Sequence, residues 1–312
     1  MDTEAYSFLR IIREMPVTMI YRLIHYYNID VPFDLRSNQL PEFLYDEIDS
    51  DVRKEILDNY QDAGKALCYF FRLDTPTPSL EELTTKSDAI ISLKRDETIF
   101  QNVPYFDRIE VHNSTETLRV RFHYYKGRTR LYDRASQTLK EYLPVLPGVV
   151  IFRPRKKLVE VRAKHSSLCK RAAISSSIAL NLKAPHPLNM LNEIYVERFL
   201  QWIDSLNNAR FEFDVRKVIS SLSMSARGRV DLRKVDEFRK YLREGILRGG
   251  HATINVDENR KIKFRIFFRN CRIYFTAFSN EEDIEIVADA LEKIGEGYRF
   301  ETPKRLIEDY LK

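Results

Sequence analysis

The sequence predicts an α+β fold, in which an N-terminal all-helical domain precedes a mixed, mainly antiparallel sheet domain with packed helices. The first reason is a change of periodicity: apolar residues recur every three or four positions up to about residue 75, and every second position after about residue 100. The second is a strand-strand-helix pattern that occurs twice in the later part of the chain. The third is size, because 312 residues, of which 44% are hydrophobic, can bury more than one core.

The first 75 residues are expected to form several short helices. Phe8, Ile11 and Ile12 share one face of the first helix, and apolar residues at 19, 20, 23, 24 and 27 share one face of the second. The break between them is M-P-V-T at 15–18, and T-P-T-P at 75–78 is the expected domain linker. The expected division is therefore a helical domain over 1–78, a linker with some helix over 79–100, and an α+β domain over 101–312.

The first strand-strand-helix unit is expected over about 118–182. In L-R-V-R-F-H-Y-Y, apolar residues at 118, 120 and 122 alternate with Arg119, Arg121 and His123, which predicts a strand with one buried face and one basic face. A turn begins at Gly127, and the strands G-V-V-I-F-R-P and L-V-E-V-R-A follow with a basic turn between them. Residues 166–182 are then expected to form a helix.

The second unit is expected over about 251–294. It contains the strands H-A-T-I-N-V, K-I-K-F-R-I-F-F and R-I-Y-F-T-A-F, followed by an amphipathic helix over 281–294 that opens with acidic residues. Helices over about 188–206 and 235–247 lie between the two units. Lys263, Arg265 and Arg269 share one side of their strand, so the second unit is also expected to carry a basic sheet face.

Charge is distributed very unevenly along the chain. Residues 1–117 hold 12 basic and 22 acidic side chains, 118–171 hold 15 and 3, and 172–312 hold 24 and 21. Clustered charge of one sign is expected of a surface that binds a polyanion. The alternative is that the basic segment pairs with the acidic first segment inside the same molecule. The candidate DNA-binding residues are Arg119, Arg121, Lys126, Arg128, Arg130, Arg153, Arg155, Lys156, Lys157, Arg162, Lys164, Lys170 and Arg171.

The sequence gives little reason to expect an enzyme. It contains none of the nucleotide-binding, metalloprotease or serine-hydrolase signatures G-x-x-x-x-G-K-[ST], G-x-G-x-x-G, H-E-x-x-H and G-x-S-x-G. Gly249-Gly250-His251 is too short to cradle a phosphate by itself and is expected to be a turn leading into a strand. His165, Ser166 and Cys169 lack a third group that would orient a base. No catalytic residue, metal site or cofactor is therefore expected.

Cysteine usage and hydropathy indicate the cellular setting. Cys68, Cys169 and Cys271 form no C-x-x-C pair, which predicts neither structural zinc nor a disulfide framework. The sequence has no basic leader followed by an apolar run, and no stretch of about 18 apolar residues. We expect an intracellular protein without a membrane partner, located in the nucleus on chromatin if eukaryotic, or in the cytoplasm and nucleoid if archaeal.

Three stretches resemble the kinetochore protein CENP-N family. F-L-R-I-I-R-E-M-P-V-T-M-I-Y-R-L-I-H-Y-Y is similar to that family's first two helices, and L-R-V-R-F resembles the start of its β-rich part. V-E-V-R-A-K, entering S-S-L-C-K-R-A-A-I, resembles a family strand with two basic residues separated by one. The similarity covers about half of the chain in order and pattern.

The resemblance implies a pyrin-like helical domain packed on a TBP-like mixed β domain that binds nucleosomal DNA without catalysis. It also implies pairing with a protein partner, or self-association, through the C-terminal part. By position, Arg10 and Arg13 would be secondary DNA contacts, and Arg162 and Lys164 would be the basic pair on the strand. The chain departs from the family in its acidic N-terminal segment, and no residue identifies a histone contact.

The favoured hypothesis is a non-enzymatic, chromatin-associated protein that grips the phosphate backbone of double-stranded DNA, free or in nucleoprotein, through a basic β-sheet surface. No sequence specificity is expected, because nothing resembles a recognition helix. One alternative is a metal-dependent nuclease that uses Glu160 and Asp133. Another is a protein- or RNA-interaction module that uses the same basic face.

Overall fold

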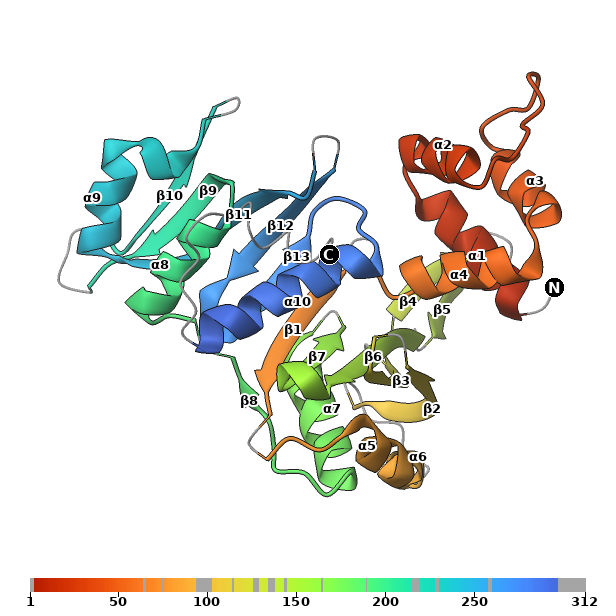
Figure 1. Cartoon of the computed structure of the whole chain (residues 1–312), viewed down its shortest axis with the longest axis horizontal. Helices are drawn as coiled ribbons and strands as arrows, with labels where there is room; N and C mark the ends of the chain where they lie inside the picture. The colour runs from red at the N-terminus through yellow and green to blue at the C-terminus, as the bar shows by residue number, and fades with distance from the viewer. Residues whose placement is uncertain are drawn as a thin grey trace.

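The computed structural model describes residues 3–296 apart from 64–65, 74–75, 94–102, 114, 126–128, 134–137, 143–144, 164, 189, 215–218, 228–229 and 258–259. A bundle of N-terminal helices lies at one end of the molecule, beside a long antiparallel sheet with further helices packed on it (Figure 1). The predicted α+β class is confirmed. None of the helices within the described residues is long and apolar enough to cross a bilayer.

The N-terminal bundle consists of α1 (Thr3–Glu14), α2 (Val17–Tyr26), α3 (Leu40–Glu47) and α4 (Ser50–Tyr60). Its core contains Phe8, Ile12, Leu44 and Ile56, all at most 1% exposed. Pro16 precedes α2 and its carbonyl accepts the first hydrogen bonds of that helix, so the predicted break between the first two helices is confirmed. The bundle therefore has an apolar core separate from those of the sheet.

The expectation of helix up to residue 75 is wrong for β1 (Leu67–Arg72), which is a strand in the middle of the sheet. Its residues L-C-Y-F-F-R are apolar on both faces, and side chains 68–71 are at most 3% exposed. A strand that is covered on both faces carries no alternation, so a short apolar run cannot be distinguished from a helix by period. The sheet therefore begins within the segment that was expected to be helical.

Ten strands form one continuous antiparallel path in the order β10-β9-β11-β12-β13-β1-β7-β6-β3-β2, and the short β8 (His186–Pro187) pairs with β1 beside it. The first half contains β2 (Tyr105–His112), β3 (Thr117–Tyr125), β6 (Val145–Arg153) and β7 (Leu158–Arg162). The second half contains β9 (Ser205–Glu212), β10 (Ser221–Ser225), β11 (Ile246–Asn255), β12 (Lys261–Phe267) and β13 (Arg272–Phe275). A separate hairpin joins β4 (Thr129–Asp133) to β5 (Thr138–Tyr142).

Helices cover opposite faces of the two halves. In the first half, α5 (Leu80–Lys86), α6 (Asp88–Ile91) and α7 (Ser166–Ala179) pack on the face to which Tyr69 and Phe71 of β1 point. In the second half, α8 (Glu193–Trp202), α9 (Asp236–Glu244) and α10 (Glu281–Glu296) pack on the face to which Cys68 and Phe70 point. We call these the α7 face and the α10 face.

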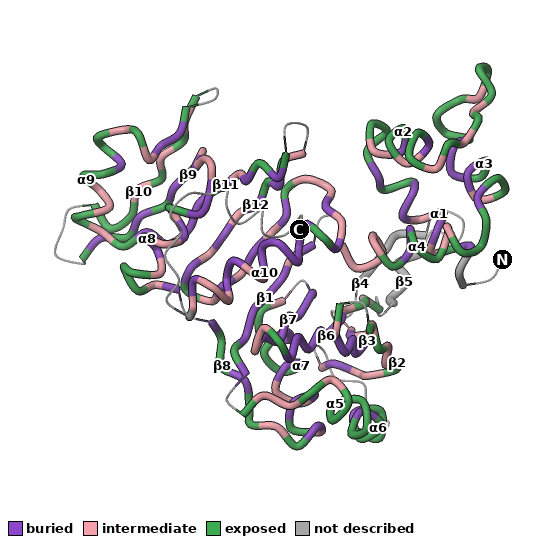
Figure 2. The backbone as a smooth tube through the Cα atoms, viewed as in Figure 1, coloured by how far each residue is buried: buried purple, intermediate pink, exposed green. Residues whose placement is uncertain are grey.

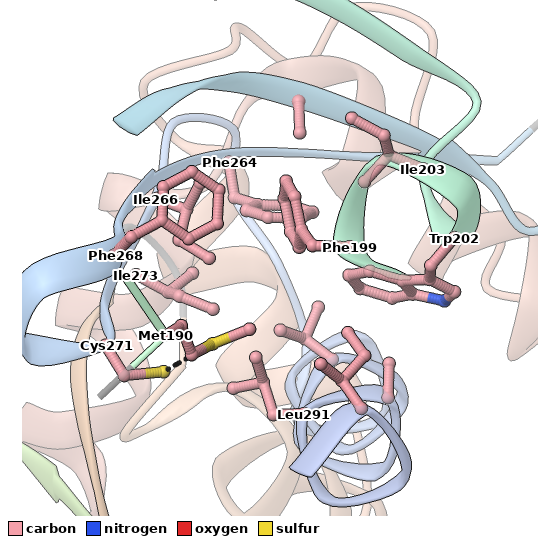
Figure 3. Packing of buried hydrophobic residues seen from close by; sticks show 14 of the residues in the cluster. Met190, Phe199, Trp202, Ile203, Phe264, Ile266, Phe268, Cys271, Ile273 and Leu291 are labelled. Carbon is pink, nitrogen blue, oxygen red and sulfur yellow. Dashed lines mark hydrogen bonds between the residues drawn. The ribbon is translucent and has the colours of Figure 1, made fainter. Parts of the chain in front are cut away.

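The core on the α10 face contains a cluster of packed aromatic side chains. Phe199 and Trp202 of α8 lie against Phe264 of β12, with Leu291 of α10 beneath them (Figure 3). Both α10 and β1 are buried along most of their length (Figure 2). The position of α10 over the central strands is therefore fixed by apolar packing.

The expected repetition of strand, strand and helix is confirmed. In the first copy β6 leads through the 3₁₀ turn η1 (Pro154–Lys156) into β7 and α7, and in the second β12 leads through η3 (Phe268–Asn270) into β13 and α10. Each turn ends in a left-handed residue, Lys157 with φ 50° and Cys271 with φ 36°. The two helices then cross to opposite faces, which leaves one face of each half without a helix of its own copy.

Candidate nucleic-acid interface

The basic residues predicted on β6 and β7 are largely buried in ion pairs. Glu160 is fully buried: its Oε2 accepts hydrogen bonds from Arg153 Nε at 3.0 Å and Nη2 at 2.6 Å, and its Oε1 accepts one from Arg162 Nε at 2.6 Å. Arg153 is 2% exposed and Arg162 is 5% exposed. Neither guanidinium is therefore available to a phosphate in this conformation.

Acidic residues of α10 complete this network from the other side. The second-copy helix extends across β1, so its first turns lie above the basic strand face of the first copy. Arg162 Nη2 donates to Glu281 Oε2 at 2.8 Å. The further pairs are Arg162–Glu281 through Nη1, Arg153–Glu285, Lys156–Glu285 and Lys156–Asp289. We call residues Arg119, Arg121, Arg153, Lys156, Glu160, Arg162, Glu281 and Glu285 the buried ion-pair network.

The arginines of β3 point to the same face and also find acidic partners. Arg119 lies 3.5 Å from Asp62 and 3.3 Å from Glu281, whereas Arg121 donates to Asp62 at 2.7 Å and to Glu110 at 2.9 Å. The alternative that the basic segment pairs with the acidic first segment is confirmed for these two residues. Period-two alternation correctly placed them opposite the apolar face, but it carried no information about what covers them.

Protonation in the network follows from this pairing. Burial alone would raise the pKa of Glu160, but the charges and hydrogen bonds of Arg162 and Arg153 outweigh it and hold the pKa well below its ordinary value. Burial lowers the pKa of Lys156, and the nearby Arg153 charge lowers it further against the pull of Asp289. Glu160 is therefore a carboxylate at neutral pH, consistent with two buried guanidinium partners.

The remaining predicted residues are scattered. Arg155 is exposed and pairs with Glu116, which belongs to the acidic first segment. Lys157 is half-buried, and Lys170 and Arg171 are exposed on α7. Lys126, Arg128 and Lys164 lie outside the described residues, and Arg130 lies in β4 with its side chain also outside them. In α1, Arg10 is half-buried and Arg13 pairs with Glu42.

The nuclease alternative depends on Glu160 and Asp133, of which only Glu160 has a described side chain. Both oxygens of Glu160 are occupied by arginines, and Asp133 lies in the separate β4–β5 hairpin with its side chain outside the described residues. Within the described residues, no three His, Cys, Asp or Glu side chains are grouped to hold a metal ion. Burial raises the pKa of each cysteine thiol, Cys68, Cys169 and Cys271.

The α7 face of the second half is different, because α8, α9 and α10 all pack on the opposite side of this half; α2 and α4 border it at one end, where they line a cavity with Lys261 and Lys263. Outward residues on β12 alternate with the core residues Ile262, Phe264 and Ile266, and the strand pairing places outward residues of β9, β11 and β13 beside them. We define the open basic face by the cations Arg210, Arg248, Lys261, Lys263, Arg265 and Arg272. Lys263 and Arg265 lie on the same face of β12, as predicted. Arg269, which was expected on that face too, lies in η3 rather than on the strand.

The charge of the open basic face is hardly compensated. Arg248 pairs with Glu212, but no described acidic side chain forms an ion pair with the other five cations. Arg265 and Arg272 lie over the ring of Phe267, with guanidinium carbons 4.6 Å and 3.8 Å from the ring centroid. Sequence reasoning noticed this face on β12 alone, because Arg210 and Arg272 come from strands whose place in the sheet the sequence did not reveal.

Compared with known proteins, the sequence matches no protein family and no curated protein. The geometry of the chain therefore carries the functional argument.

Proposed function

We propose that the protein binds double-stranded DNA without catalysis, by holding the phosphate backbone against the open basic face. The observation that carries the proposal is the contrast between the two sheet faces: the cations of the first-half strands are paired with acids, whereas five cations of the second-half sheet face have no described acidic partner. Unpaired Lys and Arg on a sheet can neutralise phosphates and release counterions. The resemblance to the CENP-N family extends the proposal to DNA in chromatin.

The contacts expected of this face are to phosphate and sugar rather than to base edges. Lys261 and Lys263 are exposed, and the successive outward residues of a strand lie about 6.6 Å apart, close to the spacing of phosphates along one DNA strand. The helices of the second half, α8, α9 and α10, pack on the opposite side of the sheet, so none of them is placed to enter a major groove from this face. Binding should therefore depend strongly on salt and weakly on sequence.

The test is binding to a labelled duplex of about 30 base pairs across a salt series. The variant R210A/K261A/K263A/R265A removes four cations of the open basic face that have no acidic partner among the described residues. The matched control R155A/K157A/K170A/R171A removes four cations from the first half. We expect the first variant to lose affinity and to reduce the slope of log K against log salt by about 3 to 4, with a much smaller change in the control.

Three results would contradict this assignment. Equal losses in the two variants would indicate a general effect of net charge, and loss in the control alone would move the site to the first half. Preferential competition by polyglutamate over duplex DNA would instead indicate an acidic protein partner. Such binding would resemble the contact inside this protein in which acidic residues at the start of α10 cover the basic strand face of the first half.

A further inference from the structure

A notch of about 290 Å³ opens on the open basic face where β9, β11 and β12 meet. The guanidinium-bearing residues Arg210, Arg248 and Arg265, one from each of the three strands, line it. Gly249 and Gly250 form the stretch of strand between them. A pocket of this size, lined by three arginines, can hold a small charged group but is too small for a large molecule.

The notch exists because of an irregularity in β11. The pairing of β11 with β9 shifts between Leu247 and Gly249, which leaves Arg248 as the extra residue of a bulge. The expectation that Gly249 and Gly250 form a turn is wrong, since both lie inside the strand. A Cβ on Gly249 would lie 2.3 Å from the Ile266 carbonyl oxygen, and one on Gly250 would lie 2.4 Å from that of Asn208. Neither position can therefore carry a side chain, and the strand backbone stays bare beside the notch.

Positive charge exceeds negative charge at the notch. Arg248 is paired with Glu212, the only acid in the lining, whereas neither Arg210 nor Arg265 has an ion pair within the described residues. Arg265 is held against the ring of Phe267, which restricts its side chain before any ligand arrives. Asn208 and Ser221 add neutral hydrogen-bonding groups to the lining.

We propose that this notch is a binding site for a single phosphate group, contacted by Arg210 and Arg265 over the bare backbone of Gly249 and Gly250. Arginine is suited to phosphate because its planar fork can donate two parallel hydrogen bonds. The inference deepens the proposed function and rests on it for the source of the phosphate, which is either an internal phosphate of DNA or a terminal phosphate. The notch itself is a property of the bulge and does not depend on that source.

The pKa of His251 can report phosphate binding in the notch. It follows the glycine pair in β11 and lies opposite Arg265 of β12 and Asn208 of β9. Burial lowers the pKa of His251, and the charge of Arg265 lowers it further. A phosphate that neutralises Arg265 should therefore raise this pKa, by roughly half a unit to one unit.

The experiment is an NMR titration of the His251 ring in the full chain, at constant ionic strength, without additive and with inorganic phosphate. It is repeated with two short duplexes, one carrying 5′-phosphates and one carrying 5′-hydroxyls. The variant R210A removes one notch guanidinium, and K261A removes a cation of the same face outside the notch. We expect phosphate to raise the His251 pKa in the wild type and in K261A, and to have little effect in R210A.

The outcomes separate the two proposals. A rise in the His251 pKa with both duplexes would show that the notch binds backbone phosphates. A rise with the 5′-phosphorylated duplex alone would show that it binds terminal phosphates. An unchanged His251 pKa with inorganic phosphate and with both duplexes would contradict the phosphate site, even if DNA binds elsewhere on the face. A shift with inorganic phosphate in a protein that fails to bind any duplex supports the notch and overturns the proposed function.

Discussion

At the scale of single residues, the most consequential group is Glu160, which holds two arginines inside the protein. Removing its charge leaves Arg153 and Arg162 without their shared partner in a buried site. Breaking a buried pair in this way costs roughly 3–5 kcal/mol. We expect E160Q to lower the free energy of unfolding by about that amount in urea denaturation, whereas E197Q, on the exposed side of α8, changes it little. Equal stability of the two variants would show that the charge of Glu160 is not needed to hold Arg153 and Arg162 in the buried site.

A second residue-scale prediction concerns acid. Burial alone would raise the pKa of Glu110, but hydrogen bonds from His112 and Arg121 and the charges of Arg121 and Arg108 lower it to about 2. A carboxyl group whose pKa is lower in the folded than in the unfolded state stabilises the fold at pH values above the unfolded-state pKa. That contribution is lost as the pH falls through the folded-state pKa. We expect the wild type to lose stability between about pH 4.5 and pH 2. In E110Q the fall over this range should be shallower, as measured by urea denaturation at each pH.

Single residues also show what the sequence could and could not reveal about the site. Alternation correctly separated Arg119 and Arg121 from their apolar neighbours, and it did the same for Lys263 and Arg265. The two pairs look alike in the sequence, yet the first meets Asp62 and Glu281 while the second has no ion-pair partner among the described acids. Accessibility depends on which helix crosses which face, and local periodicity does not encode that.

At the scale of elements, close strand pairing depends on small residues at particular positions. Gly148 of β6 lies opposite Phe122 of β3, and a Cβ there would come within 2.3 Å of the Phe122 ring. Because this ring is buried, it cannot simply swing into solvent. We expect G148A to destabilise the protein by roughly 1–3 kcal/mol in thermal or urea unfolding. The double variant G148A/F122L should recover part of the loss, and an unchanged midpoint in G148A would contradict the close contact.

The elements were predicted unequally well, for physical reasons. Amphipathic helices such as α9 and α10 can be predicted because polar residues recur along one face. Strands such as β12 can be predicted because apolar and polar residues alternate. The strand β1 is covered on both faces and so gives no periodic signal. The bulge at Arg248 was also missed, since its glycines are typical of turns.

At the scale of the whole molecule, the position of β1 predicts where the chain can be shortened. Removing residues 1–60 deletes α1–α4, whose apolar core is separate, and keeps β1 between β7 and β13. Removing residues 1–73 deletes β1 as well and leaves two half-sheets without their common strand. We expect the shorter deletion to retain cooperative thermal unfolding by circular dichroism and the longer one to lose it. Cooperative unfolding of both would mean that the halves can join without β1.

The same strand has a consequence for the order of events during synthesis. Arg72 pairs with Leu158 on one side of β1, and Cys68 pairs with Ile273 on the other. The first half-sheet can therefore assemble on the ribosome while β13 has not yet been made. During that interval β8 can pair with Phe71 and Arg72, but residues 67–69 of β1 have no partner on that edge and can pair with other chains. We therefore expect the nascent protein to be most prone to aggregation while its second half is translated. A chaperone that acts during this time is expected to bind β1.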